Sequence, residues 1–138
     1  MRECQASGVI LAAGRGVRFG AAVNKAFVEL SGKPLLLWSV EAFRAAGVIR
    51  ELVVVAGPRE KERVEEILSG IAIPHTVVSG GERRQDSSLA GIRAAQGEYV
   101  LVHDAARPLV APELILSLIH ISEPTRPLYI SYAVFCLK

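Results

Sequence analysis

A run of small residues follows the first apolar segment of the chain. The segment reads LAAGRGVRFG over residues 11–20, directly after the apolar run GVIL at residues 8–11. Small side chains allow a backbone to approach a phosphate chain, and successive backbone N–H groups can then point at its oxygens. The pattern indicates a phosphate-binding loop after a buried strand, with a tight strand-to-helix turn as the alternative.

Two well-known phosphate loops do not fit this segment. No part of the chain has the spacing G-x-x-x-x-G-K-[ST] of a Walker A loop. The dinucleotide fingerprint G-x-G-x-x-G fails because the third glycine, Gly20, comes one residue late. Glu29 is at about the right distance for a ribose-binding acid, but it stands in VELSGKP and not at a strand end.

Two cations strengthen the case for a polyphosphate site. Arg18 lies within the loop, and Lys25 follows it in the segment Asn24-Lys25-Ala26. A guanidinium and an ammonium beside a phosphate-binding loop would neutralise the charge of a polyphosphate. Their spacing favours this role over that of two ordinary solvated side chains.

A second motif, SGGERRQDSS at residues 79–88, follows the apolar run HTVV. Gly80 and Gly81 allow a turn that a ligand can approach closely. Ser87 or Ser88 is expected to cap the next helix, whose first N–H groups then face the ligand. Asp86 and Arg84 are expected to form a local ion pair.

A third motif, VHDAARP at residues 102–108, ends another apolar run. Ligands of open α/β sheets bind at the carboxyl ends of the strands. Asp104 would suit Mg²⁺ there, because this ion takes one or two carboxylates together with phosphate oxygens and water; a turn cap is the alternative. Ala105 leaves room for a ligand, His103 is expected to be structural, and Arg107 either pairs with a carboxylate or meets the substrate.

Strand and helix patterns alternate along the chain and would bring these motifs together. Strands are expected at 8–11, 51–56, 75–78 and 99–103, and helices at 34–46, 58–68, 87–95 and from Pro112 onward. Trp38 and Phe43 are assigned to the core. The alternation predicts an α/β fold with a parallel sheet covered by helices on both faces.

The composition excludes several classes of protein. The chain has 138 residues, of which 51% are hydrophobic and 22% are charged, so it is not a disordered chain. A net charge of +2 gives no basic excess that would indicate nucleic acid. No apolar run reaches the roughly 18–20 residues that cross a bilayer, and MRECQASG is not a signal peptide. The two cysteines, Cys4 and Cys136, make neither a disulfide framework nor a metal site. We expect a cytoplasmic protein without nucleic-acid or membrane partners.

The three motifs together resemble the 2-C-methyl-D-erythritol 4-phosphate cytidylyltransferases of the non-mevalonate isoprenoid pathway. The resemblance runs from about Ser7 to Ile115 and rests on four segments: LAAGRGVRFG with Asn24-Lys25, SGKPLL, SGGERRQDSSLAGI and VLVHDAARPLV. It implies a Rossmann-like nucleotidyltransferase fold, here truncated after about four strands. It also implies transfer of a cytidylyl group from CTP to methylerythritol phosphate with release of pyrophosphate, with Mg²⁺ as cofactor and a homodimer as the assembly.

The resemblance assigns roles residue by residue. Arg18 and Lys25 match the catalytic positions that stabilise the transition state. Asp104 matches the metal-associated aspartate, and Arg107 its neighbour in the substrate site. The nucleotide-binding positions are Ala12, Ala13, Gly14, Gly16, Gly81, Glu82 and Ser87.

Residues 116–138 break the pattern. The stretches LSLIHISEPTR and ISYAVFCLK can be encoded, in one reading frame, by the two ends of an adapter used in sequencing libraries. We therefore expect residues 1–115 to be the N-terminal part of a cytidylyltransferase domain and residues 116–138 to be a non-native tail from adapter read-through. The alternative is a genuine C-terminal strand. The later strands, subunit arm and substrate-phosphate residues of the family cannot be located here, so this chain is expected to be inactive.

Two other functions remain open at this stage. One is a sugar-phosphate or molybdenum-cofactor nucleotidyltransferase that shares only the first loop. The other is a non-catalytic nucleotide-binding module, against which Arg18, Lys25 and Asp104 argue together, because a binder has no need of both cations and a metal ligand.

Overall fold

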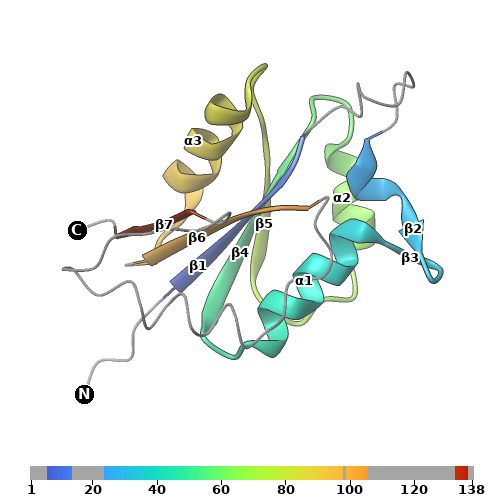
Figure 1. Ribbon diagram of the computed structural model, residues 1–138, viewed down its shortest axis with the longest axis horizontal. Coiled ribbons are helices and arrows are strands. Elements are labelled where there is room, and N and C mark those ends of the chain that lie inside the picture. The colour runs from blue at the N-terminus through green and yellow to red at the C-terminus, as the bar shows by residue number, and fades with distance from the viewer. Residues whose placement is uncertain (1–5, 14–23, 98, 106–132, 137–138) are drawn as a thin grey trace.

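A five-stranded sheet forms the centre of the molecule (Figure 1). A computed structural model describes residues 6–13, 24–97, 99–105 and, as backbone, 133–136. The strand order is β5-β4-β1-β6-β7. The strands are β1 (Ala6–Ala12), β4 (Ile49–Ala56), β5 (His75–Ser79), β6 (Tyr99–Asp104) and β7 (Ala133–Cys136). The first four are parallel to one another, which confirms the parallel sheet predicted from the sequence.

The strand β7 lies in the segment predicted to be a tail. It runs antiparallel to β6, with Val102 opposite Ala133 and Tyr99 opposite Cys136. The four strands expected from the sequence do not include it. The origin of residues 116–138 stays a prediction.

Helices cover both faces of the sheet, as predicted (Figure 1). Helices α1 (Leu35–Ala45) and α2 (Lys61–Ile67) pack on one face, and α3 (Arg84–Ala94) packs on the other. Successive residues of a strand point to opposite faces. Ile10 of β1 therefore joins the cluster that contains Phe43 of α1, while Val9 joins the cluster against which Ile92 of α3 packs.

Two glycines allow the helices to approach the sheet closely. A Cβ at Gly91 of α3 would lie 2.3 Å from a Val9 methyl carbon. On the other face, a Cβ at Gly8 of β1 would lie 2.5 Å from the Phe43 ring. Each contact is too short for a side chain, so these positions require glycine.

A short segment between β1 and α1 was not expected from the sequence. It contains a 3-10 helix, η2 (Lys25–Phe27), and a hairpin of β2 (Glu29–Leu30) and β3 (Lys33–Pro34). The hairpin turns through Ser31 and Gly32, whose φ angles are 54° and 78°.

The core assignment of Trp38 was wrong, whereas that of Phe43 is confirmed. Phe43 is fully buried, but Trp38 is only partly buried on the side of α1 that faces the hairpin. Its indole N–H donates to the Leu30 carbonyl at 2.9 Å, and Lys33 Nζ lies 4.2 Å from its ring centroid. The indole thus satisfies its donor outside the core.

The other elements lie close to their predicted positions. Helix α2 begins at Lys61, since residues 58–60 form a turn. The helix predicted from Pro112 lies outside the described residues. No helix in the described parts of the chain is long and apolar enough to cross a membrane.

Candidate functional site

The three motifs begin at one edge of the sheet, where the parallel strands end. Ala12 is in register with Ala56 of β4, and Ala56 with Ser79 of β5. On the other side of β1, Leu11 is in register with Asp104. The Ala105 N–H donates to the Leu11 carbonyl at 2.9 Å and so fixes the exit of β6 beside that of β1. The sheet thus gathers residues that are far apart in the sequence.

Three small residues from two motifs contact each other at this edge. A Cβ at Gly80 would lie 2.5 Å from Ser87 Oγ and 3.0 Å from the Ala13 Cβ. Ser87 is only 5% exposed. The exit of β1 and the first turn of α3 therefore meet across Gly80, and only a glycine fits between them. Ala13 and Ser87 thus lie on either side of Gly80, and the nucleotide-binding role of these positions stays a prediction.

The start of α3 differs from the prediction. The helix begins at Arg84, so Ser87 and Ser88 lie within its first turns and neither is its cap. The Arg83 N–H donates instead to Asp86 Oδ2 at 3.2 Å, and Arg83 Nε lies 3.5 Å from the same oxygen. A carboxylate three residues into a helix can reach back to the cap N–H, and Asp86 does so here.

The expected ion pair between Asp86 and Arg84 was also wrong. Arg84 Nη1 lies 3.6 Å from Asp104 Oδ2, which joins the second motif to the third. Arg83 precedes the helix and lies beside Asp86, whereas Arg84 is the first helical residue and turns toward β6.

Asp104 stands at the carboxyl end of β6, as predicted, and its side chain is 34% exposed. The described residues contain no cluster of three or more His, Cys, Asp or Glu side chains that could hold a metal ion. A single partly exposed carboxylate fits Mg²⁺ only when phosphate oxygens and water complete its shell, and that is the usual mode of Mg²⁺ in phosphate chemistry. His103 is 1% exposed with its ring centroid 5.6 Å from that of Phe43, which agrees with a structural role.

The predicted catalytic lysine, Lys25, is the first residue of η2 and is partly buried. The residue before it, Asn24, is only 7% exposed. Its Nδ2 donates to the Ala12 carbonyl at 2.5 Å and to Glu60 Oε1 at 2.8 Å. Sequence reasoning gave no role to the Asn24 side chain or to Glu60. The preference of asparagine for helix N-caps was the one signal that could have singled out Asn24.

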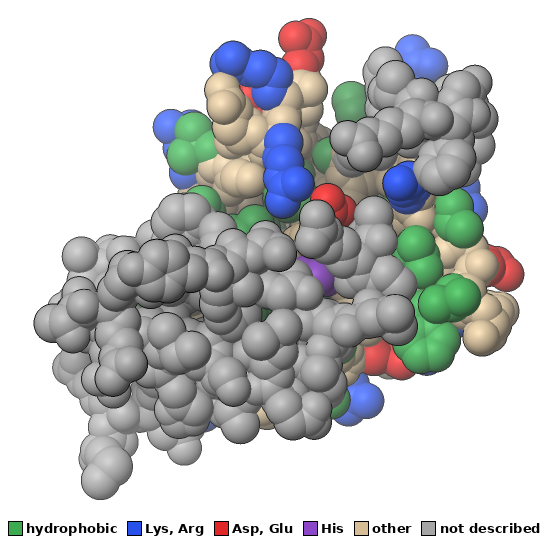
Figure 2. All heavy atoms as spheres, in the orientation of Figure 1, with side chains coloured by type: hydrophobic (Ala, Val, Ile, Leu, Met, Phe, Trp, Pro, Cys, Tyr) green, Lys and Arg blue, Asp and Glu red, His purple; other side chains and the backbone are tan. Residues whose placement is uncertain are grey.

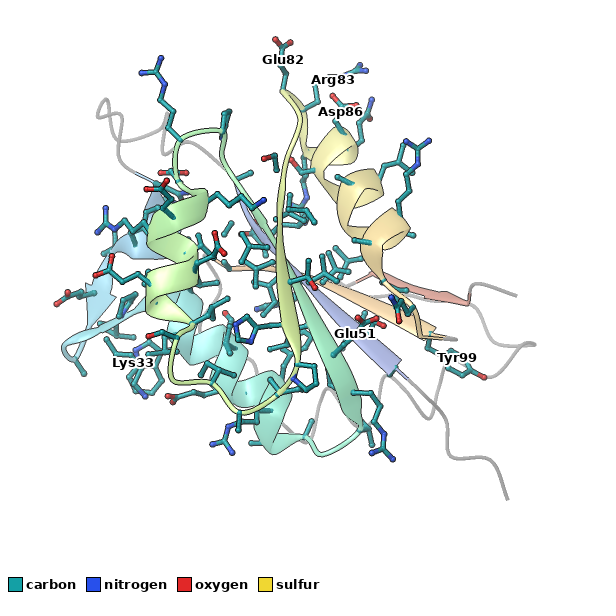
Figure 3. All side chains as sticks on the ribbon, turned by 180° about the vertical axis from the view of Figure 1, so that it is seen from behind. Lys33, Glu51, Glu82, Arg83, Asp86 and Tyr99 are labelled. Carbon is teal, nitrogen blue, oxygen red and sulfur yellow. The ribbon has the colours of Figure 1, made fainter. Side chains whose placement is uncertain are left out.

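The turn between β5 and α3 carries Gly81 and Glu82. A Cβ at Gly81 would lie 2.3 Å from the Asp86 Cβ, so this glycine too is required by close packing. Glu82 is exposed at the tip of the turn and points away from the sheet (Figure 3). The remaining predicted site residues, Gly14, Gly16, Arg18 and Arg107, lie outside the described residues.

Charged side chains gather on this face of the molecule. In Figure 2, blue Lys and Arg side chains lie on both sides of a red acidic side chain near the middle of the view. Lys and Arg side chains on this face favour the approach of an anion such as a polyphosphate.

Comparison with known proteins places this chain in a family. The model of the family described as IspD, 2-C-methyl-D-erythritol 4-phosphate cytidylyltransferase, matches residues 7–134. This match extends past residue 115.

Two curated relatives carry the same name. The protein from Caldanaerobacter subterraneus is 41% identical over 118 residues, which cover 82% of this chain and 52% of the relative. The protein from Streptomyces coelicolor is 45% identical over 113 residues, which cover 78% of this chain and 42% of the relative. The chain thus spans about half the length of the curated relatives it matches.

A solved structure shows the same fold. The crystal structure of 4-diphosphocytidyl-2C-methyl-D-erythritol synthase from Anaerococcus prevotii superposes with a TM-score of 0.75 at 26% identity, over 86% of this chain and 51% of that one. The parallel sheet, the convergence of the three motifs and the match over residues 7–134 agree, and the chain belongs to the 2-C-methyl-D-erythritol 4-phosphate cytidylyltransferase family.

Proposed function

We propose that this chain supplies the CTP-binding half of an enzyme that transfers a cytidylyl group from CTP to 2-C-methyl-D-erythritol 4-phosphate. The observation that carries the proposal is the meeting of Ala13, Gly80 and Ser87 at the edge of the sheet where Asp104 also lies. Membership of the family supports the choice of CTP and methylerythritol phosphate as substrates.

The reaction needs no covalent intermediate with the enzyme. A phosphate oxygen of methylerythritol phosphate attacks the α-phosphorus of CTP, and a new P–O bond forms. The bond from the α-phosphorus to the bridging oxygen breaks, and its electron pair leaves with pyrophosphate. Catalysis of such a step rests on positioning and on stabilisation of the negative charge that develops.

The residues of this chain divide that work. The backbone from Ala12 onward approaches the triphosphate, and the turn at Gly81 and Glu82 lies beside the cytosine and ribose. Lys25 places its ammonium near the reacting phosphate, and Arg18 adds a second cation. Arg107 contributes to the side that receives the substrate.

Asp104 is the residue that would hold Mg²⁺. When bound, the ion neutralises phosphate charge and orients the triphosphate. Asp104 Oδ2 lies 3.6 Å from Arg84 Nη1, so the carboxylate already has a cationic partner at this position. We further propose that the whole enzyme is a homodimer, as the resemblance implies, and that it is cytoplasmic.

The test uses a completed protein, in which residues 1–115 are followed by the corresponding C-terminal half of the Caldanaerobacter relative. With CTP, Mg²⁺ and methylerythritol phosphate, the folded completed protein should release pyrophosphate. ATP and GTP should support much slower release, because the turn at Gly81 reads a small pyrimidine. Omission of methylerythritol phosphate is the control for simple CTP hydrolysis.

Two results would contradict the proposal. Preference for another nucleotide would indicate a different nucleotidyltransferase. CTP binding without pyrophosphate release in a folded completed protein would indicate a binding module.

A further inference from the structure

We propose that Asn24 and Glu60 are positioning residues, which together fix Lys25 relative to the carboxyl end of β1. This inference rests on the proposed function, because it explains how the chain places the cation that acts on the triphosphate. It adds two residues that the motifs did not select.

The Asn24 side chain uses three of its hydrogen-bonding groups at once. Its two amide hydrogens go to the Ala12 carbonyl at 2.5 Å and to Glu60 Oε1 at 2.8 Å. Its Oδ1 accepts the Ala26 N–H at 2.9 Å and so caps η2. One buried side chain therefore joins the last residue of β1, the turn before α2 and the short helix that carries Lys25.

The chain makes room for Glu60 at this point. Glu60 closes the turn after β4 through its N–H, which donates to the Gly57 carbonyl at 3.0 Å. A Cβ at Gly57 would lie 2.6 Å from Glu60 Oε1, the oxygen that accepts from Asn24. Glycine at position 57 therefore leaves the space through which the Glu60 carboxylate reaches Asn24.

A second contact joins α2 to η2 on the other side of Lys25. The Arg63 guanidinium lies 4.4 Å from the centroid of the Phe27 ring, and Phe27 is 7% exposed. Lys25 thus stands between two residues, Asn24 and Phe27, that are held at the beginning of α2 by Glu60 and Arg63. These contacts hold the backbone at Lys25 in place, although the lysine side chain itself rotates about four bonds.

The placement of this backbone matters for the rate. A displacement of about 1 Å can cost about 100-fold in catalysis when a group must meet a charge that develops in the transition state. Loss of the Asn24–Glu60 contact should therefore lower kcat more than it raises the KM for CTP.

The main variant is Asn24→Asp in the completed protein. It keeps the size and the oxygen that caps η2, but it replaces the amide donors with an oxygen that faces the Glu60 carboxylate and the Ala12 carbonyl. We expect kcat to fall about 10- to 100-fold, as misplacement of a catalytic group does, with the KM for CTP within about threefold of the parent.

The decisive measurement is rescue by Glu60→Gln. In the double variant, the glutamine amide can donate to the introduced carboxylate and restore one contact with reversed polarity. It should recover at least about threefold in kcat over Asn24→Asp, which corresponds to part of an ordinary hydrogen bond. Glu60→Gln alone keeps an acceptor oxygen and should stay close to the parent.

Ser7→Ala is the matched control. Ser7 is 0% exposed, donates to Glu51 Oε2 at 2.6 Å and accepts the Gly97 N–H at 2.9 Å. Its partner Glu51 lies at the opposite end of the sheet from Glu82 and Arg83 (Figure 3). Ser7→Ala should lower the melting temperature without changing kcat, which shows what a purely structural loss does.

The outcomes separate the two proposals. A fall in kcat for Asn24→Asp with rescue by Glu60→Gln supports the inference; an unchanged kcat, or a fall without rescue, overturns it. If Asn24→Asp does not fold, Glu60→Ala decides instead, since Glu60 is only partly buried. A lowered kcat then supports the inference, and a parental kcat overturns it. If the parent itself releases no pyrophosphate, the proposed function fails and this inference fails with it.

Discussion

At the scale of single residues, the predicted metal ligand Asp104 and the predicted catalytic Lys25 are positioned by different elements at the same edge of the sheet. Asp104 is the last residue of β6, whereas Lys25 lies on a short helix that is tied through Asn24 to β1 and to Glu60, the residue before α2. Arg84 adds a cation beside Asp104 that comes from a third element, α3. The predicted site is therefore assembled from side chains whose positions depend on five separate elements: β6, η2, β1, α2 and α3.

The first prediction concerns the two cations. In the completed protein, Lys25→Ala and Arg18→Ala should each lower kcat by about 100-fold or more, the typical effect of losing one group that stabilises transition-state charge. The dissociation constant for CTP should change much less, because that charge develops only during transfer. Steady-state kinetics and calorimetric titration with CTP make the comparison. Near-parental kcat in both variants would contradict the assignment.

The second prediction concerns Asp104. Asp104→Asn keeps the size of the side chain but removes its charge. We expect the Mg²⁺ concentration for half-maximal rate to rise about tenfold or more, since losing even an outer-shell partner costs about 10- to 100-fold in metal affinity. Glu62→Gln removes one exposed carboxylate from α2 and is the control. Equal Mg²⁺ titrations for the two variants would make Asp104 a structural cap.

At the scale of elements, the close approach of α3 to the sheet places the second motif against the first. Gly91 contacts Val9 and Val55 on the inner face of α3, and Gly80 contacts Ala13 and Ser87 at its beginning. A helix held farther from the sheet would separate Ser87 from Ala13. The close packing of α3 on the sheet is thus needed to bring the second motif to the first.

The third prediction tests this packing. Gly91→Ala should lower the free energy of unfolding of the completed protein, because overpacking of a tight core costs about 1–3 kcal/mol, more than the gain of up to about 1 kcal/mol in helix propensity. Gly70→Ala is the matched control, because a Cβ there meets nothing within 4 Å. Denaturant unfolding measures both. Equal unfolding free energies for the two variants would show that α3 can shift without cost.

At the scale of the whole molecule, the sheet of four parallel strands carries the nucleotide half of the proposed site. The chain spans about half the length of the curated relatives it matches. β6 lies between β1 and the antiparallel strand β7. The segment that contains β7 is the one that we predict to be a non-native tail, although the family model matches residues 7–134.

The fourth prediction compares the chain as given with the completed protein. We expect the 138-residue chain to be poorly soluble and to release no pyrophosphate from CTP and methylerythritol phosphate. Residues 130–137, ISYAVFCL, combine high β-propensity with no charge, which is typical of segments that aggregate. Solubility, thermal unfolding and pyrophosphate release are the measurements. A soluble chain that unfolds cooperatively and is active would show that residues 116–138 are genuine, and genomic DNA read beyond codon 115 tests the same point directly.

The sequence by itself determined the class of the fold and the chemical character of the site. Runs of β-branched residues such as LVVVA at residues 52–56 predict buried parallel strands, and the motifs that follow the strands predict where a ligand binds. These features are local, because the pattern of a strand and the motif after it are formed by residues that are consecutive in the chain. They were sufficient to place Asp104, Ala13 and Gly80 at one edge of the sheet.

Only the tertiary structure decided which partner each polar side chain takes. In the structure, Asp86 contacts Arg83, and Arg84 contacts Asp104. Trp38 lies beside the hairpin, and Asn24 donates a hydrogen bond to Glu60. Asn24 precedes α1 and Glu60 follows β4 in the sequence. No local sequence pattern around either residue predicts a contact with the other. Their contact depends on the register of β1 with β4 and on the packing of α2 on η2, because these set the distance between segments that share no local pattern.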